Sequence, residues 1–423
     1  MSDTDEALKA HMLAIGARAR AGAMSLRHAP AAQRTSGLLA MAEQMRLASP
    51  DILRANALDV SAAEQVGQAA SLIDRLRLDG PRLEAITAGI EAIAAAQDPL
   101  GQIQASWRQP NGLEFTRVST PLGVIGMIFE SRPNVAADAA ALCLRAGNCV
   151  ILRAGSDSLR SVLAITGALQ AGLAQAGLER DCVQSIATGD RAAVGLMLEG
   201  LGGAIDVLIP RGGKSLIERV QREARVPVFA HLEGLCHTYL HSAADADKAI
   251  KITVNAKLRR VSVCGATETL LCDAQIAPLV LPRIAGALKD GGCQLRGDEA
   301  ARALFPMQAA DEADWSTEYL APILSVKIVD GLDEAIAHIA RYGSGHTDAI
   351  VTEDGAAGAR FCAEVDSAIV LVNASTQFAD GGEFGFGAEI GIATGKLHAR
   401  GPIGAQHLTS FKYIVRGNGQ IRP

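Results

Sequence analysis

Cys264 is the residue of this sequence best suited to act as a nucleophile. It lies in the segment VNAKLRRVSVCGATETLL, after a helix-like stretch and several basic residues, and before a glycine and an apolar run. A cysteine attacks carbonyl carbon as the thiolate, and nearby positive charge lowers the pKa of its thiol. The segment therefore permits covalent acyl chemistry at Cys264. Burial as a small core residue is the alternative that the residues alone leave open.

The other seven cysteines carry weaker signals. Five of them lie in apolar runs and are interpreted as core residues: Cys143, Cys149, Cys182, Cys272 and Cys362. Cys236 and Cys293 remain secondary candidates for a functional thiol. No CxxC pair and no histidine–cysteine spacing typical of zinc occurs. We therefore predict free thiols in a reducing compartment and no metal site.

Glycine, serine and a cation follow two of the predicted strands. The first motif contains Arg153, Gly155 and Ser156, and the second contains Gly212, Gly213 and Lys214. Exposed backbone N–H groups and the N-terminus of a helix attract the phosphate groups of a nucleotide. Each motif is also compatible with an ordinary turn, but two of them on neighbouring strands favour a shared dinucleotide site.

Several further polar residues are candidates for contact with a substrate. Asn134, in the sequence Arg132-Pro133-Asn134, is expected to cap the following helix, or to donate its amide to an oxyanion. His398 and Arg400 lie in a loop rich in glycine and proline, which is either solvated or recognises an anionic group. Glu233 precedes Cys264 and is a candidate general base, although a strand-end carboxylate is the commoner role.

The elements that must position these residues follow an α/β pattern. The chain has 423 residues, of which 49% are hydrophobic and only 4% aromatic, as expected for aliphatic layers. Helical periodicity fills the first hundred residues. Apolar strands without polar alternation then alternate with helices, at 123–129, 149–154, 183–187, 205–210 and 226–230. This pattern predicts a doubly wound parallel sheet whose ligands bind at the carboxyl ends of the strands.

A second α/β series begins at about His231. We predict a cofactor-binding domain from 1–104 and 122–230, a catalytic domain from 231–372, and a β element from 105–121 and 395–423. Two α/β units imply a cleft between them. An exposed β edge needs a partner strand, so we expect a homo-oligomer.

Charge and hydropathy exclude some classes of function. The net charge of −6 argues against general binding of nucleic acid or of acidic membranes, because both need a basic surface. No apolar run is long enough for a membrane span, and the first twenty residues do not resemble a signal peptide. We therefore expect a cytoplasmic protein.

Five segments in this order resemble the aldehyde dehydrogenase superfamily over nearly the whole chain. They are TPLGVIGMIFESRPNVAADAAALCLRAGN, LIPRGGKSLI, FAHLEGLCHTYL, VNAK…VC…ETLL and EIGIATGKLHARGP. The segment STEYLAPILSVKIVDGLDEAI also resembles the one whose glutamate holds the nicotinamide ribose, which here is Glu318. The resemblance implies a doubly wound cofactor domain, an α/β catalytic domain and a small β oligomerisation element.

The resemblance also assigns roles to residues. Cys264 matches the nucleophile, and Asn134 is the nearest match to the oxyanion-hole amide. Arg153 replaces the usual lysine and could meet the 2′-phosphate of NADP. Gly212, Gly213 and Lys214 match the second glycine turn at the cofactor. Arg132, His398 and Arg400 are assigned to the substrate.

The most similar branch of the superfamily implies a particular reaction. It uses NADPH to reduce L-glutamyl 5-phosphate to L-glutamate 5-semialdehyde and phosphate through a cysteine thioester, in the second step of proline biosynthesis from glutamate. Direct transfer of the acyl phosphate from glutamate 5-kinase is left open. The alternatives are a hydrolytic NAD(P)-dependent aldehyde dehydrogenase that uses Glu233, and a non-catalytic scaffold of the same fold. The family usually has a proline shortly before the nucleophile and an asparagine after it, where this chain has Val261-Ser262-Val263 and Gly265.

Overall fold

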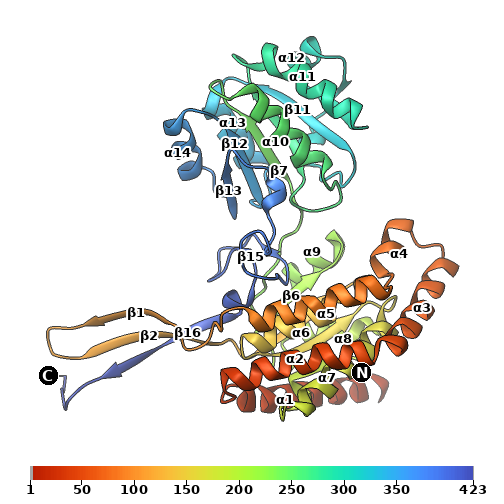
Figure 1. Cartoon of the computed structure of the whole chain (residues 1–423), viewed down its shortest axis with the longest axis vertical. Helices are drawn as coiled ribbons and strands as arrows, with labels where there is room; N and C mark the ends of the chain where they lie inside the picture. The colour runs from red at the N-terminus through yellow and green to blue at the C-terminus, as the bar shows by residue number, and fades with distance from the viewer. Residues whose placement is uncertain (1–2, 423) are drawn as a thin grey trace.

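The computed structural model describes residues 3–422. Figure 1 shows two α/β units, one above the other, and a long β arm that projects from the lower unit. The lower unit contains the N-terminal helices, and the upper unit contains most of the C-terminal half. The two units are joined by the segments around β14 (Ile392–Ala393) and β15 (Gly401–Pro402), which pair with each other between them (Figure 1).

The first unit is built on a parallel sheet of four strands in the order β5-β4-β3-β6. The strands are β3 (Val124–Phe129), β4 (Cys149–Ala154), β5 (Val183–Ser185) and β6 (Val207–Arg211). The helices are α1 (Asp3–Leu26), α2 (Ala31–Leu47), α3 (Ser49–Gln65), α4 (Ala70–Leu76), α5 (Gly80–Ala95), α6 (Asn134–Arg145), α7 (Leu159–Gln175), α8 (Arg191–Leu198) and α9 (Lys214–Glu223). Every residue of β3 and β4 is buried, because helices cover the sheet.

The second unit contains a parallel sheet of seven strands in the order β10-β9-β11-β8-β7-β12-β13. The strands are β7 (Cys236–Leu240), β8 (Thr267–Asp273), β9 (Gln294–Gly297), β10 (Gln308–Ala309), β11 (Ile323–Val329), β12 (Thr347–Val351) and β13 (Ile369–Val372). The helices are α10 (Ala246–Leu258), α11 (Ala277–Asp290), α12 (Glu299–Leu304), α13 (Gly331–Tyr342) and α14 (Gly355–Glu364). The sequence pattern did not predict β9 and β10, because both are short and contain polar residues; β10 is the edge strand and β9 lies next to it.

The predicted strand at 226–230 is wrong. Only an isolated parallel bridge joins Val228 to Leu208. The Leu208 N–H donates to the Pro227 carbonyl, and the Phe229 N–H donates to the Leu208 carbonyl. Pro227 has no N–H group to continue a ladder, so the segment passes to the second unit without forming a strand.

The β arm consists of β1 (Ile103–Arg108), β2 (Glu114–Pro121) and β16 (Thr409–Arg416). The three strands are antiparallel in the order β1-β2-β16, and β2 pairs with the C-terminal β16 over its whole length. All three strands fall within the ranges 105–121 and 395–423 of the expected β element except for the first two residues of β1. Among the described residues, no helix combines the length and the apolar character that crossing a bilayer requires.

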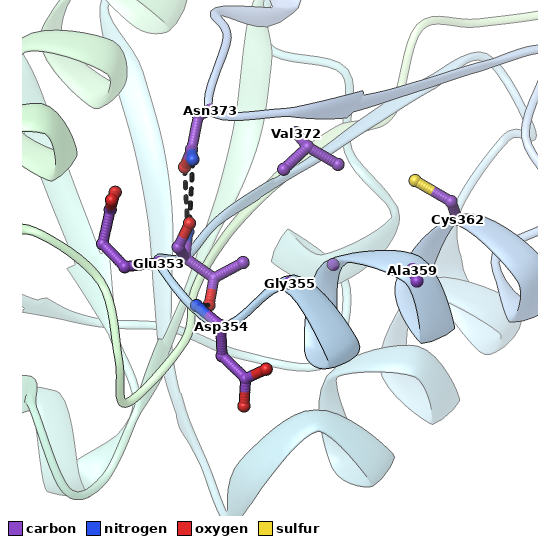
Figure 2. A pocket seen from close by; sticks show the side chains of 9 residues that line it. Glu353, Asp354, Gly355, Ala359, Cys362, Val372 and Asn373 are labelled. Carbon is purple, nitrogen blue, oxygen red and sulfur yellow. Dashed lines mark hydrogen bonds between the residues drawn. The ribbon is translucent and has the colours of Figure 1, made fainter.

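Cys362 is not a core residue, contrary to the prediction. It is exposed on α14, whose inward position is taken by the preceding Phe361. Neighbouring helical residues point about 100° apart, so the two cannot both face the core. Figure 2 shows Cys362 beside a shallow surface pocket of about 370 Å³ that also borders Val372 and Asn373. This pocket contains none of the predicted site residues.

Candidate active site

Cys264 lies in the loop between α10 and β8 and is half-buried. The backbone of Gly234 packs directly against it: a Cβ atom at Gly234 would lie 2.0 Å from the Cys264 carbonyl oxygen. The buried Cys236 thiol donates to the same oxygen at 3.1 Å. Burial raises the pKa of the Cys236 thiol well above its usual value, so it cannot serve as a thiolate. Cys264 is therefore the one cysteine near this loop that is suited to nucleophilic attack.

Gly265, where the family usually has asparagine, is explained by close packing. A Cβ atom at this position would lie 3.0 Å from the Thr376 carbonyl oxygen and 3.3 Å from Ala379 Cβ. The side chain of Gln377 donates to the carbonyl groups of Ala256 and Arg260, at 2.9 and 3.2 Å. The segment around residue 376 thus holds both ends of the Cys264 loop, and a larger residue at 265 would push it away.

A buried ion pair joins the two chain segments on either side of Cys264. Lys257 Nζ lies 2.5 Å from Glu268 Oε2, and both side chains are essentially inaccessible to solvent. Lys257 belongs to the VNAK motif and Glu268 to the ETLL motif, on either side of Cys264 in the chain. The second oxygen of Glu268 accepts from the Leu320 N–H at 3.3 Å. Lys257, predicted to be part of the basic surroundings of the thiol, is instead part of this internal pair.

Two histidines complete the surroundings of the thiol. One ring nitrogen of His231, one of His346 and the Cys264 Sγ all lie within 4.8 Å of one another. Neither His231 nor His346 was among the predicted site residues. The only local signal for His346 is its place after the glycine-containing loop YGSG and before a buried strand, which is common and unspecific.

Glu318 lies beside this cluster. One of its carboxylate oxygens accepts from the Gly234 N–H at 2.9 Å, and burial raises its pKa. Glu233, the candidate general base, forms an ion pair with Lys214 at 2.9 Å. This pair links the N-terminal turn of α9 to the segment that leads into the second unit. Glu233 and Lys214 are therefore already partners of each other.

Arg132 and Arg211 lie at the carboxyl edge of the first sheet. Phe129 of β3 pairs with Arg211 of β6, so the two strands end side by side, and Arg132 follows three residues later. Among the described residues, neither guanidinium has an ion-pair partner, and the buried Arg211 Nε has no hydrogen bond. Burial, together with the nearby charge of Arg211, lowers the pKa of Arg132 to about 10, although a Cys264 thiolate acts in the opposite direction. Arg211 was not among the predicted site residues.

Asn134 does not cap the following helix. It is the first residue of α6, the capping position is taken by Pro133, and no side-chain cap bond forms. Its amide donates instead to Asp138 at 2.9 Å, one turn later on the same helix. Burial raises the pKa of Asp138 to about 6. The role of the Asn134 amide at an oxyanion stays a prediction.

The two glycine motifs lie at the ends of β4 and β6. Gly213 precedes α9 without a side-chain cap, and its N–H donates to Glu130 Oε2 at 3.3 Å, which shows that this helix end attracts an anion. Gly155 is buried and Ser156 is exposed in the turn after β4. Arg153 is only 7% exposed, and it donates to the carbonyl groups of Ala154, Gly189 and Asp190. Its contact with a 2′-phosphate stays a prediction.

The side chains of His398 and Arg400 contact residues other than Cys264, His231 and His346. Arg400 forms an ion pair with Asp366 at 2.8 Å and also donates to the carbonyl groups of Asp366 and Thr394. His398 is exposed, its Nε2 lies 3.2 Å from the His407 carbonyl oxygen, and its ring contacts Phe229. Arg400 thus holds the segment before β15 against the second unit. A direct role of His398 or Arg400 in binding substrate stays a prediction.

Residues 1–300 of this chain, which include the half-buried Cys264, match the aldehyde dehydrogenase family. The chain therefore belongs to this family. It is 62% identical to the gamma-glutamyl phosphate reductase of Caulobacter sp. (strain K31), over 98% of this chain and 100% of that protein. It is 59% identical to the gamma-glutamyl phosphate reductase of Hyphomonas neptunium, over 100% and 99% of the two chains. Within the family, the chain belongs to the gamma-glutamyl phosphate reductases.

A solved structure agrees with these relatives. The crystal structure of gamma-glutamyl phosphate reductase from Thermotoga maritima matches with a TM-score of 0.95 and 40% identity, covering 97% of this chain and 100% of that one. An acetylating aldehyde dehydrogenase from Geobacillus thermoglucosidasius matches with a TM-score of 0.70 at 17% identity, over the full length of both chains. The latter likeness shows the fold alone. The predicted fold class is confirmed.

Proposed function

We propose that this chain catalyses the NADPH-dependent reduction of L-glutamyl 5-phosphate to L-glutamate 5-semialdehyde and phosphate, the second step of proline biosynthesis from glutamate. The observation that carries the proposal is the half-buried Cys264 thiol, placed beside two histidines and near two arginines without ion-pair partners among the described residues. The identity of the substrate is inferred from the names of the relatives, which are about 60% identical over the whole chain. Glutamate 5-kinase would provide this labile acyl phosphate, and we propose a cytoplasmic location because a free catalytic thiol requires a reducing compartment.

The residues of the chain suit acyl transfer followed by reduction. The Cys264 thiolate attacks the acyl carbon, the bond to the phosphate oxygen breaks, and a thioester remains. Phosphate is a good leaving group, and cationic side chains stabilise the charge that develops on it. A bound NADPH supplies the hydride that reduces the thioester to the aldehyde.

Several features of the chain fit a nicotinamide cofactor. The uncapped N-terminus of α9 after Gly213 offers N–H groups to a phosphate, as its contact with Glu130 indicates. Glu318 is held against Gly234, which in turn packs on Cys264, so a ribose bound to Glu318 would lie beside the nucleophile. We propose that the first unit, with Gly155, Ser156, Gly212, Gly213 and Lys214, holds the rest of the cofactor and that the second unit provides the nucleophile.

The reverse reaction is the direct test of this function. Glutamate 5-semialdehyde should reduce NADP only when inorganic phosphate is present, because phosphate must cleave the thioester. Reduction without phosphate would instead identify the hydrolytic aldehyde dehydrogenase. That alternative needs a free base at Glu233, whose carboxylate is paired with Lys214. No reduction under either condition would contradict both activities and favour a scaffold.

Arg132 and Arg211 are proposed to hold the phosphate. In the reverse assay, Arg132→Gln or Arg211→Gln should raise the KM for phosphate by about tenfold or more, since one charge-assisted hydrogen bond is worth about 1.5–3 kcal/mol. The KM for the semialdehyde should change much less. Arg54→Gln is the control, because Arg54 is an exposed residue on α3 paired with Asp51. An equal rise in both KM values would show a general disturbance of the site.

The β arm is proposed to join copies of this chain. Its exposed face carries aromatic residues from all three strands, with Trp107 stacked on Phe115 at 5.3 Å and in edge contact with Tyr413 at 6.0 Å. Tyr413 is 53% exposed and Phe411 44%. Such an apolar face beside two unpaired strand edges is expected to be covered by a partner.

Light scattering after gel filtration can test the oligomer. Tyr413→Glu should lower the measured mass of the assembly, because a charge would be buried in its interface. Ser410→Glu adds the same charge to the opposite face of β16 and should leave the mass unchanged. A single-chain mass for the unmodified protein would contradict the proposal.

A further inference from the structure

Two histidine rings lie beside the Cys264 thiol, although they come from distant parts of the sequence. His231 lies between α9 of the first unit and β7 of the second unit, and His346 lies directly before β12. The rings meet edge to face with centroids 5.1 Å apart, and a nitrogen of each lies within 4.8 Å of the Cys264 Sγ. The proposed reaction as written above uses neither ring, yet its first step must remove the thiol proton.

The hydrogen bond of His231 fixes its tautomer. Its Nδ1 lies 2.7 Å from the carbonyl oxygen of Ile392, which can only accept. Nδ1 therefore carries the hydrogen, and Nε2 has a free lone pair. The same carbonyl would stabilise the imidazolium that forms when Nε2 takes up a proton. His231 is also half-buried, so its ring can exchange a proton with solvent.

His346 is unsuited to this role. It is completely buried, and its Nε2 has no hydrogen-bond partner among the described residues. Its Nδ1 lies 2.9 Å from the Thr347 hydroxyl. Burial lowers the pKa of His346 to about 4, so the ring is neutral near pH 7. Of the two rings, His231 is the one whose tautomer is fixed by a carbonyl acceptor and whose side chain is reached by solvent.

Given the function proposed above, we propose that His231 is the acid–base partner of Cys264. Nε2 accepts the thiol proton as the Sγ–C bond forms, and it returns that proton to the phosphate oxygen as the C–O bond breaks with its electron pair. After the aldehyde has left, His231 transfers a proton from solvent to the Cys264 thiolate. Each cycle thus consumes one solvent proton, as reduction of an acyl phosphate to an aldehyde requires.

Other ionisable groups face this pair from the surrounding elements. They are Arg132 after β3, Lys214 in α9, Glu233 between α9 and β7, Glu318 before β11, Asp348 in β12 and Glu389 before β14. Glu318, Glu389 and Asp348 all act on His346 in the direction that raises its pKa, although burial outweighs them. Because the parent and the His231 variant differ at one position only, the charges of these surrounding groups are the same in both proteins.

The reactivity of the thiol is the decisive measurement. The rate at which iodoacetamide modifies Cys264 is followed against pH by mass spectrometry, in a Cys362→Ala background that removes the exposed competing thiol. His231→Gln should slow the modification at pH 7 about tenfold and move its midpoint to higher pH. His11→Gln, an exposed histidine of α1, is the matched control. His231→Gln should also lower kcat of the phosphate-dependent reaction by about 10²-fold or more.

An unchanged pH profile of modification in a folded His231→Gln protein would overturn the proposal. The same profile shift in His346→Gln, without one in His231→Gln, would overturn it too by assigning the proton to the other ring. If His231→Gln fails to fold, His231→Asn keeps a donor near the Ile392 carbonyl and replaces it in the assay. If the parent protein lacks phosphate-dependent activity but His231→Gln still shifts the pH profile of Cys264 modification, the Cys264–His231 pair is supported and the proposed substrate is wrong.

Discussion

Cys264→Ala should abolish the phosphate-dependent reduction of NADP by glutamate 5-semialdehyde, with a loss of at least about 10⁴-fold in kcat. Losses of this size follow the removal of a nucleophile because no covalent intermediate can then form. The change should leave folding almost intact. The side chain is half-buried and reaches no core cluster, so only a small volume is lost.

Cys362→Ala is the matched control for this experiment. It also removes one thiol, but from the exposed face of α14 beside the shallow pocket of Figure 2. Its activity should equal that of the parent protein, and iodoacetamide should still inactivate it. Residual activity in Cys264→Ala above about one hundredth of the parent would contradict a thioester on this residue. Resistance of Cys362→Ala to inactivation by iodoacetamide would instead identify Cys362 as the reactive thiol.

Lys257→Met should destabilise the protein by about 3–5 kcal/mol, because it leaves the Glu268 carboxylate buried without its partner. Chemical unfolding with the fluorescence of Trp315, in the same unit, can measure the change. The effect should extend to catalysis, since the pair brackets the Cys264 loop and Glu268 also holds the Leu320 N–H. The double variant Lys257→Met with Glu268→Met should regain much of the stability, because no charge is then buried.

The pH dependence of this loss is a further expectation. Burial raises the pKa of Glu268 to about 7, and the charge and hydrogen bond of Lys257 act in the opposite direction. Without Lys257 the folded carboxyl should bind its proton still more tightly, while in the unfolded chain it titrates near pH 4.3. The folded state then binds more protons than the unfolded state, so stability falls as pH rises above that value. Lys257→Met should lose more stability at pH 8 than at pH 5.5, and a loss independent of pH would contradict this.

The positions of the two arginines and of the two histidines show where sequence reasoning reaches its limit. Arg132 and Arg211 could each be recognised as strand-end cations, but only the pairing of β3 with β6 brings them to the same edge. His346 had no motif of its own. Its proximity to Cys264 results from the order of strands in the second sheet, in which β7 lies between β8 and β12.

The sequence by itself determined the order of helices and strands through most of the chain and the α/β class, and it predicted Cys264 as the nucleophile among the eight cysteines. These features are local, because burial on a sheet or on one face of a helix leaves a periodic pattern of apolar residues. Only the tertiary structure decided which charges meet. Lys257 turns inward to Glu268, Arg400 to Asp366 and Asn134 to Asp138, whereas His231 turns toward the thiol. Most of these partners lie far apart in the chain, and where a side chain points depends on the space and the hydrogen-bond acceptors that packing provides, which no local pattern records.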